Sequence, residues 1–178
     1  MRIDLKPVTT LNEDERAALK ALTTAVYPPH VVTDSQNREI QWAPPAYSVL
    51  VFSPEGELVS HVGIVIRMGT LDGVAIKIGG VGSVKTHPRA RGHGYASGGL
   101  RRAANALHDD HQVAFSLLVC RDPFLPFYGR LGWLPFTDTL RVEQPTGSIV
   151  FNSYRPMVLA GLGKAPQHGT IDLKGLPW

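Results

Sequence analysis

Glycine and arginine alternate in a loop near the middle of the chain, between a glycine-rich segment and the start of a predicted helix. The loop has the sequence HPRARGHGYA over residues 87–96. The preceding segment, IGGVGSV (78–84), is typical of a strand, and glycine inside a strand often marks a bulge or the close approach of a ligand to the backbone. Apolar residues from Ala96 to Leu107 then follow at helical spacing. A chain with this order places a loop of little side-chain bulk directly before a helix.

Such a loop is suited to binding an anion. The first N–H groups of a helix lack intrahelical acceptors, and the helix dipole makes that end partly positive. Gly92 and Gly94 allow the backbone to approach an anion without an intervening Cβ, and Arg89 and Arg91 add positive charge. The pattern therefore predicts a phosphate or pyrophosphate site, although neither G-x-x-x-x-G-K-[ST] nor G-x-G-x-x-G is present. A glycine turn with solvated arginines is the alternative interpretation.

The periodicity of the remaining sequence predicts one mixed α/β domain over residues 1–178. Thr10 and Asn12 are each followed three residues later by Glu, so both are capping-box candidates for a helix that ends before YPPH (27–30). A loop is expected at 33–47 and a short helix that closes at Gly132. Strands are expected at 47–52, 58–67, 70–78, 78–84 and 113–119, with two more within 134–143 and 148–159, before a tail punctuated by glycine and proline.

Composition excludes several classes of protein. Hydrophobic residues make up 43% and charged residues 19% of the 178, as in a soluble globular protein. No apolar run approaches the roughly 20 residues that span a bilayer, and the N-terminus is too polar for a signal peptide. Cys120 is the single cysteine, which favours a reducing, cytoplasmic location. The net charge of +3, with no Lys/Arg stripe outside 89–102, argues against a nucleic-acid partner, and seven scattered histidines predict no metal site.

Two motifs carry a resemblance to a known family. HPRARGHGYA resembles the R/Q-x-x-G-x-G/A signature of the GCN5-related N-acetyltransferase (GNAT) superfamily, with Arg91, Gly94 and Ala96 at the signature positions. FYGRLGW (127–133) resembles the second motif of that superfamily, at the expected distance downstream. The resemblance implies the GNAT fold, a twisted, mixed and mostly antiparallel sheet flanked by helices. On this analogy the sheet splays open between its fourth strand, 78–84, and its fifth.

The resemblance also implies a cofactor, acetyl-CoA, bound in the wedge between those two strands. Its pantetheine arm would pair with the backbone of 81–84, and its pyrophosphate would lie on the loop. Tyr128 resembles the general acid that protonates the leaving thiolate; the alternative is a core tyrosine packed beside Phe127 and Trp133. The cofactor-binding residues expected on this basis are Val81, Gly82, Ser83, Val84, Arg89, Arg91, Gly92, His93, Gly94, Tyr95 and Ala96.

The general base is not identified by the sequence. Many relatives carry a glutamate on the fourth strand, where this chain has Gly79 and Gly80. The alternatives are His61, Asp72, Asp34 and Glu39, and their spacing does not select among them.

A narrower resemblance concerns the acceptor. RLGWLPF, the PTGSIVFN segment and the final GLPW are similar to the bacterial aminoglycoside 2'-N-acetyltransferases. That likeness implies that Trp178 and its carboxylate, with Asp172, Asp34 and Glu39, receive a cationic sugar; an aromatic lid over the core is the alternative for Trp178. The acidic residue expected just before the terminal Trp is absent from Leu176-Pro177.

The sequence therefore predicts an acetyl-CoA-dependent N-acetyltransferase acting on a primary amine of a small, cationic molecule. The other readings are an acetyltransferase for another amine or a peptide N-terminus, a non-catalytic acyl-CoA-binding regulatory domain, and, least favoured, a nucleic-acid binder. No membrane partner and no metal are expected. The sequence leaves open a homodimer, the acyl length and the identity of the acceptor.

Overall fold

A ten-stranded sheet runs through the residues that the computed structural model describes, 1–28 and 40–178. Its order is β6-β9-β5-β4-β3-β10-β7-β8, and β1 and β2 are added beside the first half of β3. The pairs β4–β5 and β7–β10 are parallel and the others antiparallel. The strands are β1 (Arg2–Pro7), β2 (Tyr47–Phe52), β3 (Leu58–Leu71), β4 (Val74–Thr86), β5 (Phe115–Cys120), β6 (Leu134–Pro135), β7 (Thr139–Gln144), β8 (Gly147–Val150), β9 (Arg155–Ala160) and β10 (Thr170–Asp172).

The sheet divides between β4 and β5. These strands pair over only three positions, Ile78–Gly80 against Phe115–Leu117, after which β4 continues to Thr86 without β5 beside it. The chain leaves β4 through the arginine- and glycine-rich loop and returns to β5 through α2 (Tyr95–Asn105). The expected mixed, mostly antiparallel sheet that splays between its fourth and fifth strands is therefore confirmed.

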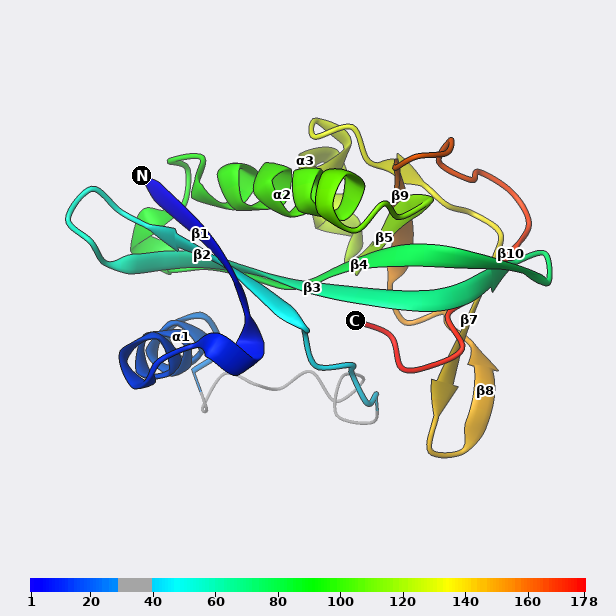
Figure 1. Ribbon diagram of the computed structural model, residues 1–178, viewed down its shortest axis with the longest axis horizontal. Coiled ribbons are helices and arrows are strands. Elements are labelled where there is room, and N and C mark those ends of the chain that lie inside the picture. The colour runs from blue at the N-terminus through cyan, green and yellow to red at the C-terminus, as the bar shows by residue number, and fades with distance from the viewer. Residues whose placement is uncertain (29–39) are drawn as a thin grey trace.

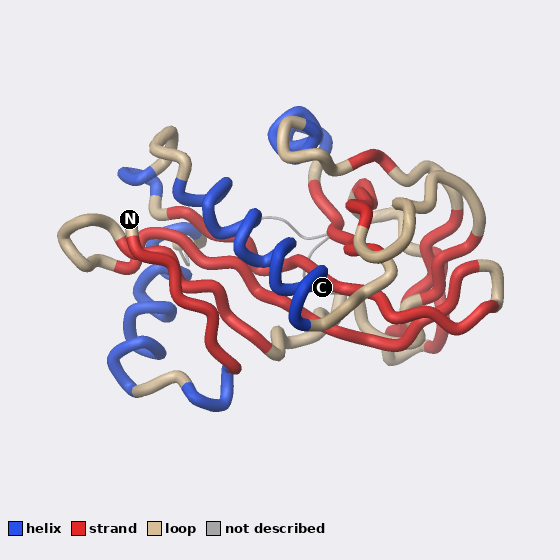
Figure 2. Tube along the Cα trace, turned by 45° about the horizontal axis from the view of Figure 1, so that its top comes forward, coloured by secondary structure: helices blue, strands red, loops and turns tan. Residues whose placement is uncertain are grey.

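Helices cover the two faces of the sheet unequally (Figure 1). Helix α2 and the short α3 (Leu125–Gly129) lie on one face, while α1 (Glu13–Val26) and the C-terminal segment lie on the other. Figure 2 shows α2 running across the central strands. Two of the buried clusters follow from this arrangement. One packs Leu100 and Ala103 of α2, and Leu107 just after it, against the sheet, and another surrounds Trp178.

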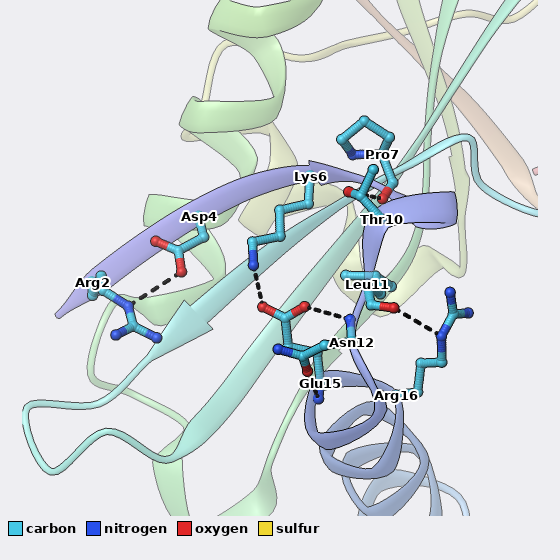
Figure 3. Close-up of polar contacts among 9 residues, drawn as sticks. All are labelled: Arg2, Asp4, Lys6, Pro7, Thr10, Leu11, Asn12, Glu15 and Arg16. Atoms are coloured by element: carbon cyan, nitrogen blue, oxygen red, sulfur yellow. Dashed lines mark hydrogen bonds and ion pairs between the residues drawn. The ribbon is translucent and has the colours of Figure 1, made fainter.

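The start of α1 is fixed by local hydrogen bonds (Figure 3). The Glu15 N–H donates to Asn12 Oδ1 over 2.8 Å, and the Asn12 N–H donates to Glu15 Oε2 over 3.0 Å, which completes a capping box. Lys6 of β1 forms an ion pair with the same Glu15, so the helix is tied to the sheet. The Thr10 candidate was wrong: Thr10 ends a 3-10 turn, and its hydroxyl donates to the Pro7 carbonyl.

Other expectations needed correction. The segments 70–78 and 78–84 belong largely to one strand, β4, which begins after the Asp72-Gly73 turn. Four strands, not two, lie within 134–160, and β1 and β10 were not predicted at all. The three-residue β10 forms inside the glycine- and proline-containing tail because β3 and β7 pair with it on both sides. Residues 40–46 have no regular structure, and the rest of the predicted loop as far as 39 lies outside the described residues.

Candidate active site

A cleft of about 1160 Å³ opens where β4 and β5 separate. It reaches from the N-terminus of α2 on one face of the sheet to the C-terminal segment on the other. The structure thus brings together residues that the sequence predicted from separate motifs. Those that line the cleft are Val81, Gly82, Ser83, Val84, Arg91, Gly92, Gly94, Tyr95, Ala96, Tyr128 and Trp178.

The loop before α2 has the geometry of an anion site. Gly92 and Gly94 have φ angles of +82° and +78°, and Gly94 is the N-cap of α2. A Cβ at either glycine would meet no atom within 4 Å, so the space beside the backbone is open. The N–H groups of the first helical turn lie at the cleft with Tyr95, Ala96 and Ser97. This arrangement fits the diphosphate of a coenzyme A molecule.

Two predicted cofactor residues lie beside the cleft instead of lining it. The Arg89 guanidinium forms an ion pair of 2.6 Å with Glu57, at the solvent-exposed surface. The imidazole of His93 donates from Nδ1 to the Arg91 carbonyl over 2.9 Å, and so folds back on its own loop. Both side chains therefore contact other residues of this chain and do not line the cleft.

Four lining cations were missed by the sequence reasoning: Lys85, Arg101, Arg121 and Arg130. Arg101 lies on α2 two turns after Gly94, so helical spacing could have indicated that it faces the loop. Arg121 and Arg130 flank the FYG motif in sequence, and Lys85 lies near the end of β4. Its amino group donates to the Thr23 hydroxyl over 3.0 Å, and burial lowers its pKa.

The bulge in β4 lies at Ser83, which has a φ of +50°. The buried His61 of β3 holds it, because its Nδ1 donates to the Ser83 carbonyl over 2.9 Å while Nε2 lies 3.1 Å from the Ser48 hydroxyl. Burial lowers the pKa of His61 to about 4, so the ring is neutral at pH 7. A bulge redirects the strand, and here it lies in the pairing of β4 with β3, within the part of β4 that continues beyond its last residue paired with β5.

Tyr128 is both a core residue and a residue of the cleft, the two positions that the sequence allowed for it. Its ring packs edge-on against Phe127 and Trp133, with centroids 5.1 and 6.4 Å away, and the side chain lies in the core cluster beneath α2. It also lines the cleft. Burial raises the pKa of Tyr128, so the phenol keeps its proton at neutral pH and can act as a donor.

Trp178 occupies the base of the split on the α1 face. Its Nε1 donates to the Leu117 carbonyl of β5 over 2.9 Å, and the residue is 6% exposed. A Cβ on Gly80 would lie 2.5 Å from Cδ2 of the indole. The glycine that stands in place of the strand glutamate therefore makes room for this ring.

The predicted acidic residues are not brought to the cleft. Asp172 lies on β10, where its carboxylate pairs with the Lys174 amino group at 2.7 Å and accepts from the Lys174 N–H. Asp72 lies in the β3–β4 turn and accepts from the Thr170 N–H, while Asp34 and Glu39 lie outside the described residues. Within the described chain, the lining of the cleft includes no Asp or Glu side chain.

The described residues lack two kinds of feature. They include no group of three or more His, Cys, Asp or Glu side chains that could hold a metal ion. None of the helices among them is both long enough and apolar enough to cross a membrane.

The chain is similar to one family and to many solved structures. Residues 7–136 match the family model described as an acetyltransferase (GNAT) domain. A GNAT family acetyltransferase from Brucella melitensis in complex with acetyl-CoA is 14% identical, with a TM-score of 0.58 over 96% of this chain and 94% of that one. No curated protein matches the chain.

Two further structures show the same fold. A GNAT family N-acetyltransferase from Escherichia coli in complex with CoA has a TM-score of 0.60 and 15% identity, covering 98% of this chain and 91% of that one. An acyl-CoA N-acyltransferase from Pseudomonas aeruginosa has a TM-score of 0.59 and 18% identity, covering 89% and 99%.

Proposed function

The chain belongs to the GNAT acetyltransferase family, and from that premise we propose that it transfers the acetyl group of acetyl-CoA to a primary amine of a small molecule. The observation that carries this proposal is the position of the β4–β5 split. It opens directly beside an α2 N-terminus whose two glycines leave the backbone uncovered. The coenzyme A and acetyl-CoA found in the Escherichia coli and Brucella melitensis structures support the choice of cofactor.

The residues on the α2 face would hold the cofactor. The first-turn N–H groups and Arg91 face the place proposed for the diphosphate, and Arg101 adds a second positive charge there. The edge of β4 from Val81 to Val84 is released from β5 and can pair with an amide-bearing chain. When bound, acetyl-CoA supplies an acetyl group activated as a thioester.

We propose that Tyr128 serves the leaving group. Its phenol keeps its proton because burial raises its pKa, and it lines the cleft beside Cys120 and Phe127. A neutral donor in a site shielded from water stabilises negative charge that develops on a departing sulfur. Backbone N–H groups at the Ser83 bulge are the proposed donors to the acetyl carbonyl oxygen.

The amine must lose a proton to attack. Because no Asp or Glu side chain among the described residues lines the cleft to accept that proton, and because both ring nitrogens of His61 already have partners, the Ser83 carbonyl and the Ser48 hydroxyl, we propose that the acceptor binds in its neutral form. The value of kcat/KM then rises with pH up to the pKa of the acceptor itself.

An aminoglycoside acceptor is the narrower form of the proposal. A polycation needs several carboxylates, and the residues described along the cleft supply positive charge instead, from Lys85 and four arginines. This acceptor would therefore depend on the carboxylate of Trp178, whose carbon a Cβ on Gly82 would meet at 2.7 Å, and on Asp34 and Glu39, which lie outside the described residues.

Replacing Tyr128 by Phe tests the proposed reaction. Removing the donor should lower kcat by about 10²-fold, the usual contribution of one acid–base group, because the departing sulfur loses its hydrogen bond. Thiol release from acetyl-CoA gives the rate, and calorimetry with coenzyme A should give an unchanged Kd. Tyr47→Phe is the matched control, since Tyr47 is a half-buried tyrosine that does not line the cleft.

Two results would contradict the proposal. An unchanged kcat in Tyr128→Phe would remove this phenol from the mechanism. Coenzyme A binding without thiol release, tested against a broad set of amines, would instead support a regulatory acyl-CoA-binding domain.

A further inference from the structure

The cleft has two halves, and the one on the α1 face is not used by the proposed cofactor contacts. The proposed cofactor half is lined by Gly92 and Gly94 of the loop and by Arg101 of α2, and α2 lies on the opposite face of the sheet from α1 (Figure 1). The α1 half is lined by the end of α1, by residues 42–43 and by Trp178, with Tyr154. In the proposed reaction the thioester would lie in the split between these halves, so the amine would approach it from the α1 side.

Aromatic side chains dominate this second half. Trp42 and Tyr154 pack with ring centroids 5.9 Å apart, and Phe151 lies behind them, 6.0 Å from Trp42 and 6.3 Å from Tyr154. Trp42 and Tyr154 are half-buried, so part of each ring remains accessible at the cleft. Tyr27, at the end of α1, also lines the cleft and is 48% exposed.

These rings are held together by the backbone. The Ala43 N–H donates to the Pro177 carbonyl over 2.7 Å. This hydrogen bond holds the irregular segment that contains Trp42 against the C-terminal segment that contains Trp178. Trp42 and Tyr154 both pack against the buried cluster that contains Trp178. The Arg67 guanidinium supports this cluster from below, with one N–H donating to the Leu176 carbonyl and its centre 5.3 Å from the Trp178 ring.

The charge of the cleft distinguishes between a polycationic amine and an amine with a single charge and an aromatic ring. Among the described residues, five cationic side chains and no Asp or Glu side chain line the cleft, so a polycationic acceptor finds no acidic side chain to pair with there and is repelled by Lys85. Aromatic faces gain most from a flat ring, through offset or edge-to-face packing. From these rings and this charge we propose that the acceptor is an arylalkylamine, a primary amine on a short chain attached to a planar ring that packs on Trp42 and Tyr154. This inference rests on the proposed acetyl transfer for its chemistry, but concerns only the acceptor.

Three amines test it directly. The ligand 2-phenylethylamine carries a planar ring, 2-cyclohexylethylamine has the same carbon skeleton without planarity, and tobramycin is polycationic. With coenzyme A present, calorimetry should show that the phenyl compound binds about tenfold more tightly than its cyclohexyl analogue, as expected for an added ring-on-ring contact. Tobramycin should bind most weakly of the three.

Trp42→Leu should remove the advantage of the planar ring and leave the Kd of coenzyme A unchanged, which also shows that the variant is folded. Tyr47→Leu, which removes a half-buried ring outside the cleft, should retain the advantage. Tyr154→Leu replaces Trp42→Leu as the test if the latter does not fold. The comparison of ligands on the unchanged protein needs no variant.

Equal binding of the phenyl and cyclohexyl amines, or tightest binding of tobramycin, would overturn the inference. Thiol release with tobramycin but not with 2-phenylethylamine would overturn it while leaving acetyl transfer intact. Ring-dependent binding without thiol release from any amine would overturn the proposed reaction and leave the aromatic site standing.

Discussion

Gly94 is placed to serve both the folding of α2 and the proposed binding of coenzyme A. It caps α2 at a φ of +78°, a conformation that side-chain-bearing residues rarely adopt, and it faces open space in the cleft. We expect Gly94→Ala to destabilise the fold by about 1 kcal/mol and to weaken coenzyme A binding by at least about tenfold, because a methyl group would stand where the diphosphate approaches. Calorimetry and denaturant unfolding measure the two effects separately.

The control for Gly94→Ala is Gly73→Ala. Gly73 has a φ of +81° and equally open surroundings, but it lies in the β3–β4 turn, away from the cleft. It should show the same loss of stability with no change in the Kd of coenzyme A. If both variants bind coenzyme A as the unchanged protein does, the loop is not the diphosphate site.

At this scale, local patterns in the sequence predicted the residues whose role depends on the backbone of one segment. Gly92, Gly94 and Tyr128 are examples, since each belongs to a short motif that fixes its position. The aromatic half of the cleft could not be predicted in this way. Trp42 and Tyr154 meet only through tertiary packing, and no periodicity in the sequence relates them.

Among the elements, β4 determines where the site lies. Its glycines allow Trp178 to fill the base of the split, since a Cβ on Gly80 would lie 2.5 Å from the indole Cδ2. We expect Gly80→Ala to lower the free energy of unfolding by about 1–3 kcal/mol, the usual cost of overpacking. Because the strain arises between these two residues, Gly80→Ala combined with Trp178→Leu should cost less than the sum of the single variants.

Denaturant unfolding of the four proteins of this double-mutant cycle measures the coupling. Gly56→Ala, in a turn where a Cβ would meet no atom within 4 Å, replaces Gly80→Ala in the control cycle and should give additive values. Additivity for Gly80 and Trp178 would mean that the ring moves aside at no cost, and that glycine is not needed in β4 to hold it.

The strands were predicted according to how strongly local sequence defines them. YSVLVF matched β2 at both ends, because an apolar run followed by a Pro-Gly turn is sufficient. In contrast, β10 has three residues and forms because β3 and β7 flank it, which is a property of the assembled sheet. The β4–β5 split is also a property of the assembled sheet. The residues alone indicated only that the strand beside it is rich in glycine.

Over the whole molecule, the two faces of the sheet present different kinds of residues to the cleft. The α2 face carries the helix N-terminus and its arginines, and the α1 face carries the aromatic rings, with the split as the passage between them. Among the described residues, neither face contributes an Asp or Glu side chain to the cleft. In the proposed reaction the cofactor would therefore bind beside the helix N-terminus and its arginines, and the acceptor beside the aromatic rings.

The stability of the molecule should depend on pH through His61, which joins β2, β3 and the bulge of β4. Burial lowers its pKa from 6.5 to about 4. At a pH between these two values, His61 is protonated in the unfolded chain and neutral in the folded chain. The free energy of unfolding therefore falls as the pH falls, by about 2 kcal/mol between pH 6.5 and 5 for this one group. Asp172 and Glu15 have lowered pKa values, so the stability that they contribute is lost at lower pH, mainly below about 4.

Chemical denaturation at pH 7.5, 6.5 and 5 tests this window. His61→Gln should be less stable than the unchanged protein at pH 7.5, because the Ser83 carbonyl loses its buried donor, and its stability should hardly change down to pH 5. His168→Gln, which removes a histidine whose side chain is 83% exposed, should keep the full pH dependence. If the free energy of unfolding of His61→Gln still falls between pH 6.5 and 5, another group is responsible for the pH dependence. The prediction that His61 makes the stability of the bulge depend on pH would then be wrong.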